Sequence, residues 1–166
     1  YNIENKQPLG KGGQAKAFLV ESNDRTRKAV YKIFKPADLD DLTNFHRHAQ
    51  LCPQIEHPQI STFIGTHEET GQIGGMDITV FSTLTEYIEG DDLGTYIEQK
   101  GKLPAQEAAG IVLELLDPVE YIHNLEDTVL HRDIKPANII LPKDGKATLI
   151  DLGIAKKKGK NTTMAS

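Results

Sequence analysis

Cysteine is almost absent from this chain of 166 residues, in which Cys52 is the only one. A single thiol excludes a disulfide within the chain and favours a reduced compartment, so we expect a cytoplasmic location. Long apolar runs are missing too, which predicts no transmembrane segment. No signal peptide opens the chain, and its start at Tyr1 rather than Met suggests a piece of a longer protein.

A basic surplus is also lacking. Lys and Arg number 19 against 24 Asp and Glu, which gives a formal net charge of -5. Nucleic-acid backbones attract basic surfaces, so we expect no nucleic-acid partner, and we interpret the basic run at residues 156–160 as a solvated loop. Apolar residues make up 38% of the chain, which suits a globular domain or two small lobes that share a cleft.

The first half of the chain reads mainly as strands, and no internal repeat is visible. Apolar and β-branched runs bounded by turn residues predict strands, and a stretch without Gly or Pro after Pro36 predicts one helix. The turn-rich segment Gly71–Gly75 separates the last two strands. The predicted strands are Ala17–Ser22, Lys28–Phe34, Ile60–His67 and Ile78–Tyr87, and the predicted helix is Asp38–Leu51.

The second half has a different pattern. Residues 104–124 predict a long helix with Ile111, Leu115, Val119 and Ile122 on one face. Pro118 removes a backbone hydrogen bond inside it, so we expect a kink there. The apolar runs Ile139–Leu141 and Ala147–Ile150 flank a Pro- and Gly-containing turn and predict a hairpin. A strand-rich lobe, a short connector and a helical lobe follow from this order.

Three motifs could carry chemistry. The segment 10–15 holds Gly10, Gly12 and Gly13, whose backbone could approach a phosphate, although glycine turns are common. Lys32 lies on a predicted strand and could hold phosphates, or it could be an ordinary solvated lysine.

The segment His131-Arg132-Asp133-Ile134-Lys135-Pro136-Ala137-Asn138 is much more specific. The carboxylate of Asp133 could accept a proton from a hydroxyl, and Lys135 could neutralise a transferred phosphoryl group. The amide oxygen of Asn138 suits a hard divalent cation, which prefers oxygen ligands. Asp151, in Asp151-Leu152-Gly153, could join such a cation to phosphates, and the glycine allows a sharp turn after it.

Together and in this order, the motifs resemble the eukaryotic-type protein kinase family, including its bacterial members. The resemblance covers essentially the whole chain, with Ala15 where the third glycine of the loop usually stands. It implies ATP and Mg²⁺ as cofactors, Lys32 as the phosphate-binding lysine and Asp133 as the catalytic base. It also implies Asn138 and Asp151 as metal ligands, and Lys135 as the lysine typical of Ser/Thr kinases.

The same resemblance implies the adenine site and the fold. Ala17, Val30 and Ile140 would enclose the adenine ring, the backbone of Glu86 and Ile88 would meet its edge, Asp92 would meet the ribose, and Thr85 would be the gatekeeper. The fold class is α+β: a two-lobed kinase-like fold with a strand-rich N-lobe holding one helix (1–85), a hinge (86–92) and an incomplete helical C-lobe (93–166).

The chain departs from the family pattern in the helix that follows the third strand. The family places there a glutamate that pairs with the phosphate-binding lysine, and counting back from His57-Pro58 puts His48 at that position. An imidazole cannot replace a carboxylate as the partner of Lys32. Two alternatives stay open: the register is wrong, or Glu68 takes the role.

The second departure is the end of the chain, which stops within the expected activation segment and lacks the family's Ala-Pro-Glu motif. We expect either a truncated longer protein or a minimal kinase. A protein partner or the missing C-terminal segment could then supply activation. Within the tail, Thr162, Thr163 and Ser166 are potential phosphosites with Arg132 as the expected partner of the phosphate.

The sequence therefore predicts a Ser/Thr protein kinase that transfers the γ-phosphoryl group of ATP to a Ser or Thr hydroxyl of a protein substrate. An ATP-binding pseudokinase or scaffold is the first alternative, favoured by His48 and the missing end. A small-molecule phosphotransferase is the second, and Lys135 and the Asp151-Leu152-Gly153 turn speak against it.

Overall fold

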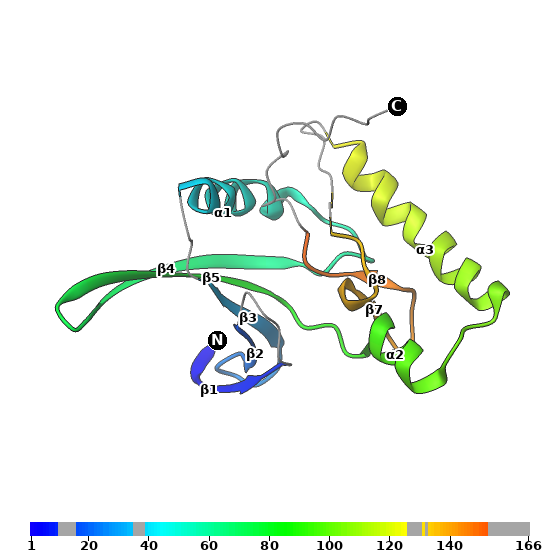
Figure 1. The fold of residues 1–166 in the computed structure, drawn as a ribbon, viewed down its shortest axis with the longest axis horizontal. Coiled ribbons are helices and arrows are strands. Elements are labelled where there is room, and N and C mark those ends of the chain that lie inside the picture. The colour runs from blue at the N-terminus through cyan, green and yellow to red at the C-terminus, as the bar shows by residue number, and fades with distance from the viewer. Residues whose placement is uncertain (10–15, 35–38, 126–130, 132, 153–166) are drawn as a thin grey trace, which may run out of the picture.

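The computed structural model describes residues 1–9, 16–34, 39–125, 131 and 133–152. It is built from a large sheet with one helix and a small sheet with two helices (Figure 1). In chain order, the elements are β1 (Asn2–Pro8), β2 (Lys16–Glu21), β3 (Lys28–Phe34), α1 (Leu39–Leu51), the 3-10 turn η1 (Cys52–Gln54), β4 (Phe63–Ile73), β5 (Met76–Glu86), β6 (Asp91–Asp92), α2 (Leu93–Lys100), α3 (Ala105–His123), the 3-10 turn η2 (Pro136–Asn138), β7 (Ile139–Leu141) and β8 (Thr148–Leu149).

The large sheet is antiparallel, in the order β1-β2-β3-β5-β4. Because side chains alternate along a strand, β3 divides its residues between two faces. On one face, Phe34 packs with Phe81 of β5 and with Phe45 of α1, which holds the helix over the sheet. On the other face, Ala29 and Tyr31 are buried beside Val20 of β2.

The β4–β5 hairpin is longer than the sequence predicts. Both strands run for 11 residues, and the chain reverses only at Gly74–Gly75. These two glycines have φ of 61° and 81°, a left-handed conformation that suits a tight hairpin turn. The prediction that the whole segment Gly71–Gly75 forms the turn is therefore wrong, because Gly71 pairs with Ile78 inside the ladder. The predicted start of the strand at Ile60 is also early, since β4 begins at Phe63.

The small sheet has the order β6-β7-β8. Its hairpin β7–β8 confirms the one predicted around the turn at residues 142–145. The predicted inner face of α3 is confirmed as well, because Leu115 and Ile122 are buried while Ile111 and Val119 pack against the same core. Buried apolar residues from both parts of the chain complete this core: Cys52, Ile55, Ile60, Ile139, Ala147 and Leu149.

The outward face of α3 carries apolar side chains that the described part of the chain leaves exposed. Val112, Leu113 and Leu116 are 59%, 65% and 56% exposed. No helix in the described ranges is both long and apolar enough to cross a membrane.

Helix α2 is an element that the sequence reading missed. The side chain of Asp92 accepts hydrogen bonds from the backbone N–H of Thr95 at 3.0 Å and from its hydroxyl at 2.6 Å, which caps the helix N-terminus. Gly101 ends the helix with φ of 82°. The sequence signal for this helix was an Asp at its start and a Gly nine positions later, the usual residues at helix ends. The signal was weak because the helix is only 8 residues long and has no fully buried side chain.

Pro118 lies inside α3, which continues through it to His123. A proline has no N–H, so the carbonyl of Glu114, four residues earlier, loses its helical partner. Gln59 replaces that partner: its Nε2 donates to the Glu114 carbonyl at 2.9 Å and to the Ala147 carbonyl at 3.0 Å. The backbone N–H of Ala147 in turn donates to the Glu114 carboxylate at 2.8 Å. Gln59 is buried, and its hydrogen bonds join the loop before β4 to helix α3 and to the residue before β8.

Candidate active site

The segment before β7 folds back on itself and brings three predicted site residues together. Nζ of Lys135 lies 2.9 Å from Oδ2 of Asp133, and Nδ2 of Asn138 donates to the same oxygen at 3.0 Å. Asn138 also donates to the Asp133 backbone carbonyl at 2.9 Å. The 3-10 turn η2 produces this arrangement, because it returns Asn138 to the side of Asp133. We call Asp133, Lys135 and Asn138 the loop cluster.

His131 supports the loop cluster from below. His131 is buried, with 2% of the residue's surface exposed. The backbone N–H of Asp133 donates to its Nδ1 at 3.4 Å. Burial lowers the pKa of His131, and this effect exceeds the opposite influence of nearby backbone groups and carboxylates. The ring is therefore a neutral acceptor at neutral pH and fixes the backbone of Asp133.

A second group of charges lies between the two sheets. Lys32 of β3 forms an ion pair with Asp151, which follows β8. The two residues are 119 positions apart in the sequence, so folding of the whole chain brings them together. The N–H of Ile150 donates to the carbonyl of Asn138 at 3.0 Å, which sets Asp151 beside the loop cluster.

Asn138 and Asp151 suit a hard divalent cation. The Nδ2 group of Asn138 faces Asp133, which turns its amide oxygen away from that residue. An amide oxygen and a carboxylate on neighbouring backbone are the donor types that Mg²⁺ prefers. The chemistry of this donor set therefore fits the metal ligands that the sequence predicts.

His48 of α1 lies next to this ion pair. Burial is the main influence on its ring and lowers the pKa of His48; Asp151 opposes that change and Lys32 adds to it. Nε2 of His48 lies 3.3 Å from Sγ of Cys52, and the ring packs edge-on against Phe63. The helix thus directs the uncharged imidazole of His48 toward Lys32 and Asp151. We call Lys32, Asp151 and His48 the cleft cluster.

Cys52 and Glu68 have other roles than chemistry at this site. Burial raises the pKa of the Cys52 thiol to about 12, so it stays protonated. The carboxylate of Glu68 lies 3.7 Å from Nδ1 of His46, on the exposed side of α1. Glu68 therefore pairs with His46 in this structure, which disfavours the alternative that it replaces the missing partner of Lys32.

The residues predicted around the adenine ring come from both sheets. Ala17 of β2 lies opposite Lys32, and Val30 of β3 lies opposite Thr85 of β5. Ile140 of β7 pairs with Asp92 of β6. Glu86 ends β5, where its carboxylate accepts a hydrogen bond from the Thr62 hydroxyl at 2.8 Å, and Ile88 follows in the connector.

Asp92 has a structural task besides the predicted contact with ribose. Partial burial acts to raise its pKa, but the hydrogen bonds from Thr95 and nearby backbone outweigh this and lower the pKa of Asp92 overall. Several predicted residues lie outside the described part of the chain: Gly10, Gly12, Gly13, Ala15, Arg132, residues 156–160, Thr162, Thr163 and Ser166.

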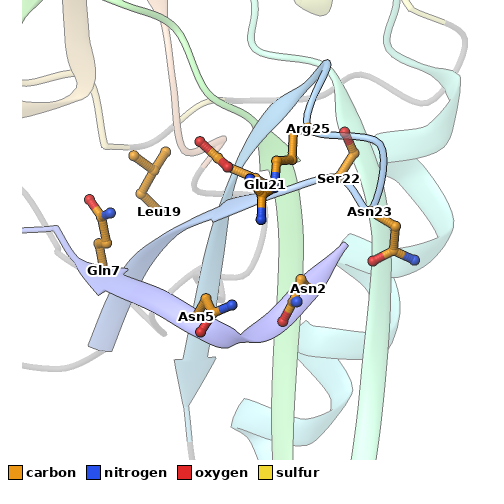
Figure 2. Close-up of a pocket in the computed structure, with 8 residues that line it drawn as sticks. All are labelled: Asn2, Asn5, Gln7, Leu19, Glu21, Ser22, Asn23 and Arg25. Atoms are coloured by element: carbon orange, nitrogen blue, oxygen red, sulfur yellow. The ribbon is translucent and has the colours of Figure 1, made fainter.

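A separate hollow lies on β1, β2 and the turn that follows (Figure 2). Amide side chains of Asn2, Asn5, Gln7 and Asn23 line it, together with Arg25. None of the cleft-cluster or loop-cluster residues borders this hollow, so it is distinct from the candidate active site.

Known sequences that resemble this chain show its family. Residues 3–166 match the model of the protein kinase domain. The chain belongs to the protein kinase family. Curated relatives include the Ser/Thr-protein kinase PrkC of Bacillus subtilis, 30% identical over 150 residues, and human Ser/Thr-protein kinase tousled-like 1, 27% identical over 158 residues. Each alignment covers 89% of this chain but only 22% and 20% of the relative, so the chain spans about a fifth of their length.

Solved structures agree on the kinase fold. The Mycobacterium tuberculosis PknI kinase domain is similar with a TM-score of 0.70 at 24% identity, over 89% of this chain and 57% of that one. Rad53 residues 1-466, solved in complex with AMP-PNP, is similar with a TM-score of 0.70 at 23% identity, over 89% of this chain and 37% of that one. The α+β, kinase-like fold predicted from the sequence is confirmed.

Proposed function

We propose that this kinase domain transfers the γ-phosphoryl group of ATP to a Ser or Thr hydroxyl of a protein substrate. The observation that carries the proposal is the loop cluster, in which Asp133, Lys135 and Asn138 are within hydrogen-bond distance of one another. The relatives that match are named Ser/Thr-protein kinases, which supports the class of acceptor. The single, free cysteine is in keeping with the reduced, cytoplasmic setting that we propose.

Each residue then has a defined task. Bound ATP supplies the phosphoryl group, and Mg²⁺ would be held by Asp151 and Asn138, where it offsets phosphate charge. Asp133 orients the acceptor hydroxyl and receives its proton, while Lys135 lies beside it to offset charge on the phosphoryl oxygens. Lys32 holds the nucleotide phosphates, so its ion pair with Asp151 has to loosen when the nucleotide binds.

The adenine would lie between Ala17 and Val30 on one side and Ile140 on the other, against the backbone of Glu86 and Ile88, with the ribose at Asp92. The described neighbours of these residues support that assignment: Ala17 lies opposite Lys32 in the large sheet, and Lys32 forms an ion pair with Asp151, which follows the small sheet. The glycines at positions 10, 12 and 13 complete the proposed phosphate site. A lobe boundary near residues 86–92 is part of the same proposal.

A regulatory pseudokinase is the second candidate, and the cleft cluster favours it. Lys32 is paired with Asp151, and α1 offers His48 where the sequence pattern expects a glutamate. Such an arrangement would bind nucleotide without efficient turnover until a partner protein or further chain repositions α1.

Two measurements on the same sample separate these functions. The first is the melting temperature with Mg-ATP, with ATP plus a chelator, and without ligand; a ligand at about 100 times its Kd adds roughly 2.7 kcal/mol of stability. The second is transfer of labelled γ-phosphate to a generic protein acceptor and, in parallel, to small hydroxylated acceptors. Stabilisation with protein labelling supports the kinase, stabilisation alone supports the pseudokinase, and labelling of small acceptors alone contradicts both.

A further inference from the structure

The part of the β4–β5 hairpin nearest its turn, residues 69–80, extends beyond the rest of its sheet. Strand β3 pairs with Phe81–Glu86 of β5 and stops there, whereas β4 and β5 continue to the turn at Gly74–Gly75. Figure 1 shows this hairpin projecting past the end of α1. Strand β4 is one of the two edge strands of the sheet, and its outer side has no strand partner in the described part of the chain. A long free edge is a ready template for another strand.

The two faces of the hairpin differ. On the face that carries α1, polar groups pair with one another: Thr70 with Thr79 at 3.0 Å, and Gln72 with Asp77 at 2.9 Å. The opposite face of β5 carries Ile78, Val80 and Leu84, with the small residue Ser82 between the last two. Ser82 is buried, and its hydroxyl donates to the His67 carbonyl at 3.1 Å. Met76 extends this face to the turn and is 68% exposed.

Strand β4 leaves that apolar face open at two places. Gly65 lies opposite Leu84 and Gly71 lies opposite Ile78, and a Cβ added at either glycine would meet nothing within 4 Å. A side chain from a strand beside β4 could therefore lie across each glycine and contact the apolar residue behind it. Between the two glycines, Glu69 presents an exposed carboxylate on the same face.

Charge limits which strand would fit. The hairpin itself, residues 63–86, contains four Asp and Glu and no Lys or Arg. Glu68 and Glu69 are neighbours and therefore point to opposite faces of β4, so an added strand meets a carboxylate on either face. On the α1 face, the Glu68 carboxylate also lies 3.7 Å from Nδ1 of His46. Opposite charges in laterally paired strands stabilise the pairing, and an acidic segment would be repelled.

We propose that the free edge of β4 is a docking site for an extended, basic segment of a partner protein, which joins the sheet as an additional strand. Lys or Arg of the partner faces Glu69 and Glu68, and apolar side chains lie over Gly65 and Gly71. Main-chain hydrogen bonds supply affinity. The open positions at Gly65 and Gly71, which we call the glycine notches, and the two carboxylates select the sequence of the partner segment. The site is separate from the nucleotide cleft and does not depend on catalysis.

The test uses a blocked, fluorescent peptide, Val-Thr-Arg-Arg-Thr-Thr-Val, titrated with the chain and followed by anisotropy. Antiparallel pairing would place its valines over Gly71 and Gly65 and its arginines beside Glu69 and Glu68. A control peptide has proline in place of the second and sixth residues, which removes edge hydrogen bonds while keeping the charge. Proteins for comparison are Glu69→Lys, Gly71→Val and the charge control Glu56→Lys, an exposed site off the hairpin.

We expect the first peptide to bind, and its Kd to rise about five- to tenfold with Glu69→Lys, in keeping with loss of one cross-strand charge pair and gain of a repulsion. Gly71→Val should also weaken binding, because its side chain fills the notch; valine suits a strand, and an unchanged melting temperature would show that the fold is kept. Glu56→Lys should leave the Kd within about twofold, since salt screens distant surface charges.

Three results would overturn the proposal. The first is no binding at millimolar protein. The second is equal binding of the proline peptide, which would mean simple charge attraction. The third is concentration-dependent self-association, seen by sedimentation and abolished by Glu69→Lys, which would make a second copy of the chain the occupant.

Discussion

The loop cluster and the cleft cluster lie side by side but are held in different ways. Asp133, Lys135 and Asn138 are joined over two and five residues of sequence, so one turn of backbone is enough to form their contacts. Lys32, His48 and Asp151 come from β3, α1 and the end of β8, and the ion pair among them spans 119 residues. The first cluster depends on local geometry, and the second depends on how the sheets and α1 pack.

This difference indicates where the domain can be regulated. A locally closed cluster changes little when distant elements shift, whereas a cluster made from three elements responds to each of them. We therefore expect the chemical group Asp133 to be preorganised, and the arrangement of Lys32 and Asp151 to vary with nucleotide and with the position of α1.

The largest effect should follow Asp133→Asn in the loop cluster. Removal of the base should lower phosphoryl transfer by roughly 10²- to 10⁴-fold, the range for loss of general acid–base catalysis. Nucleotide affinity should stay nearly unchanged, because the proposed role of Asp133 is to face the acceptor hydroxyl and not ATP, so its loss should affect turnover. Parallel turnover and Mg-ATP titrations check this, with Asp144→Asn, an exposed site in the β7–β8 turn, as the matched control. A comparable fall in affinity would contradict the role of Asp133.

The next effect concerns Gln59, which joins α3 to the residue before β8, the strand that leads to Asp151. Gln59→Leu leaves the buried carbonyl of Ala147 and the partly buried carbonyl of Glu114 without this donor. A buried unsatisfied group costs about 1–3 kcal/mol and a partly buried one less, so we expect a loss of roughly 2–4 kcal/mol in unfolding free energy. Urea denaturation measures it. Gln54→Leu, at an exposed glutamine, should cost less than about 0.5 kcal/mol.

A double-mutant cycle makes that prediction specific. With Pro118→Ala, the helix regains an N–H that can donate to the Glu114 carbonyl, so the cost of Gln59→Leu should shrink by about 1 kcal/mol or more. An unchanged cost in that background would mean that the side chain of Gln59 acts only through packing.

A moderate effect is expected for His48→Glu in the cleft cluster. A glutamate on α1 could take Lys32 from Asp151 and free that carboxylate for the metal, which should raise transfer about five- to thirtyfold, or roughly 1–2 kcal/mol. Gln50→Glu, an exposed site on the same helix, should leave the rate unchanged. In a Lys32→Met background that keeps measurable activity, His48→Glu should have no effect, because the glutamate then has no lysine to pair with. A gain in that background would mean that the substitution acts through α1 as a whole and not through a pair with Lys32.

The smallest effect is a pH dependence of stability from the buried histidines. Burial is the first cause that lowers the pKa of His48 and of His131 below the usual 6.5. The unfolded chain therefore binds protons more readily, and folding stability is present above pH 6.5 and declines as the pH falls below it. The loss is at most about 1.4 kcal/mol per histidine and pH unit. Urea midpoints between pH 7 and 5.5 measure it, and His48→Gln should flatten the curve whereas the exposed site His67→Gln should not.

The sequence predicted what is local. The spacing of Asp133, Lys135 and Asn138 is enough to anticipate the loop cluster, because one turn sets it. The inner face of α3 and the β7–β8 hairpin were predicted for a similar reason, since periodicity and turn residues are properties of short windows. The position of His48 relative to His57-Pro58 also led to a residue that lies beside Lys32 and Asp151.

What the sequence did not reveal depends on distant partners. The direct pairing of Lys32 with Asp151 and the bridge made by Gln59 join residues that no local pattern connects. Glycine is common in turns, so the local pattern at Gly71 predicts a turn, although Gly71 lies in a strand whose length depends on its partner. Helix α2 was missed because its stability comes from the Asp92 cap and from contacts, not from a periodic apolar face.

The proline in α3 also bears on the order in which the domain folds. Until the loop before β4 arrives, the carbonyl of Glu114 can keep only water as its partner, and the donor that replaces water is 55 residues away. The second half of α3 should therefore become rigid late, when both sheets meet, and interactions formed after the transition state mainly slow unfolding. Stopped-flow kinetics of Gln59→Leu should show faster unfolding with nearly unchanged refolding. The side-chain amide of Gln59 would then stabilise the folded domain kinetically, by slowing its unfolding.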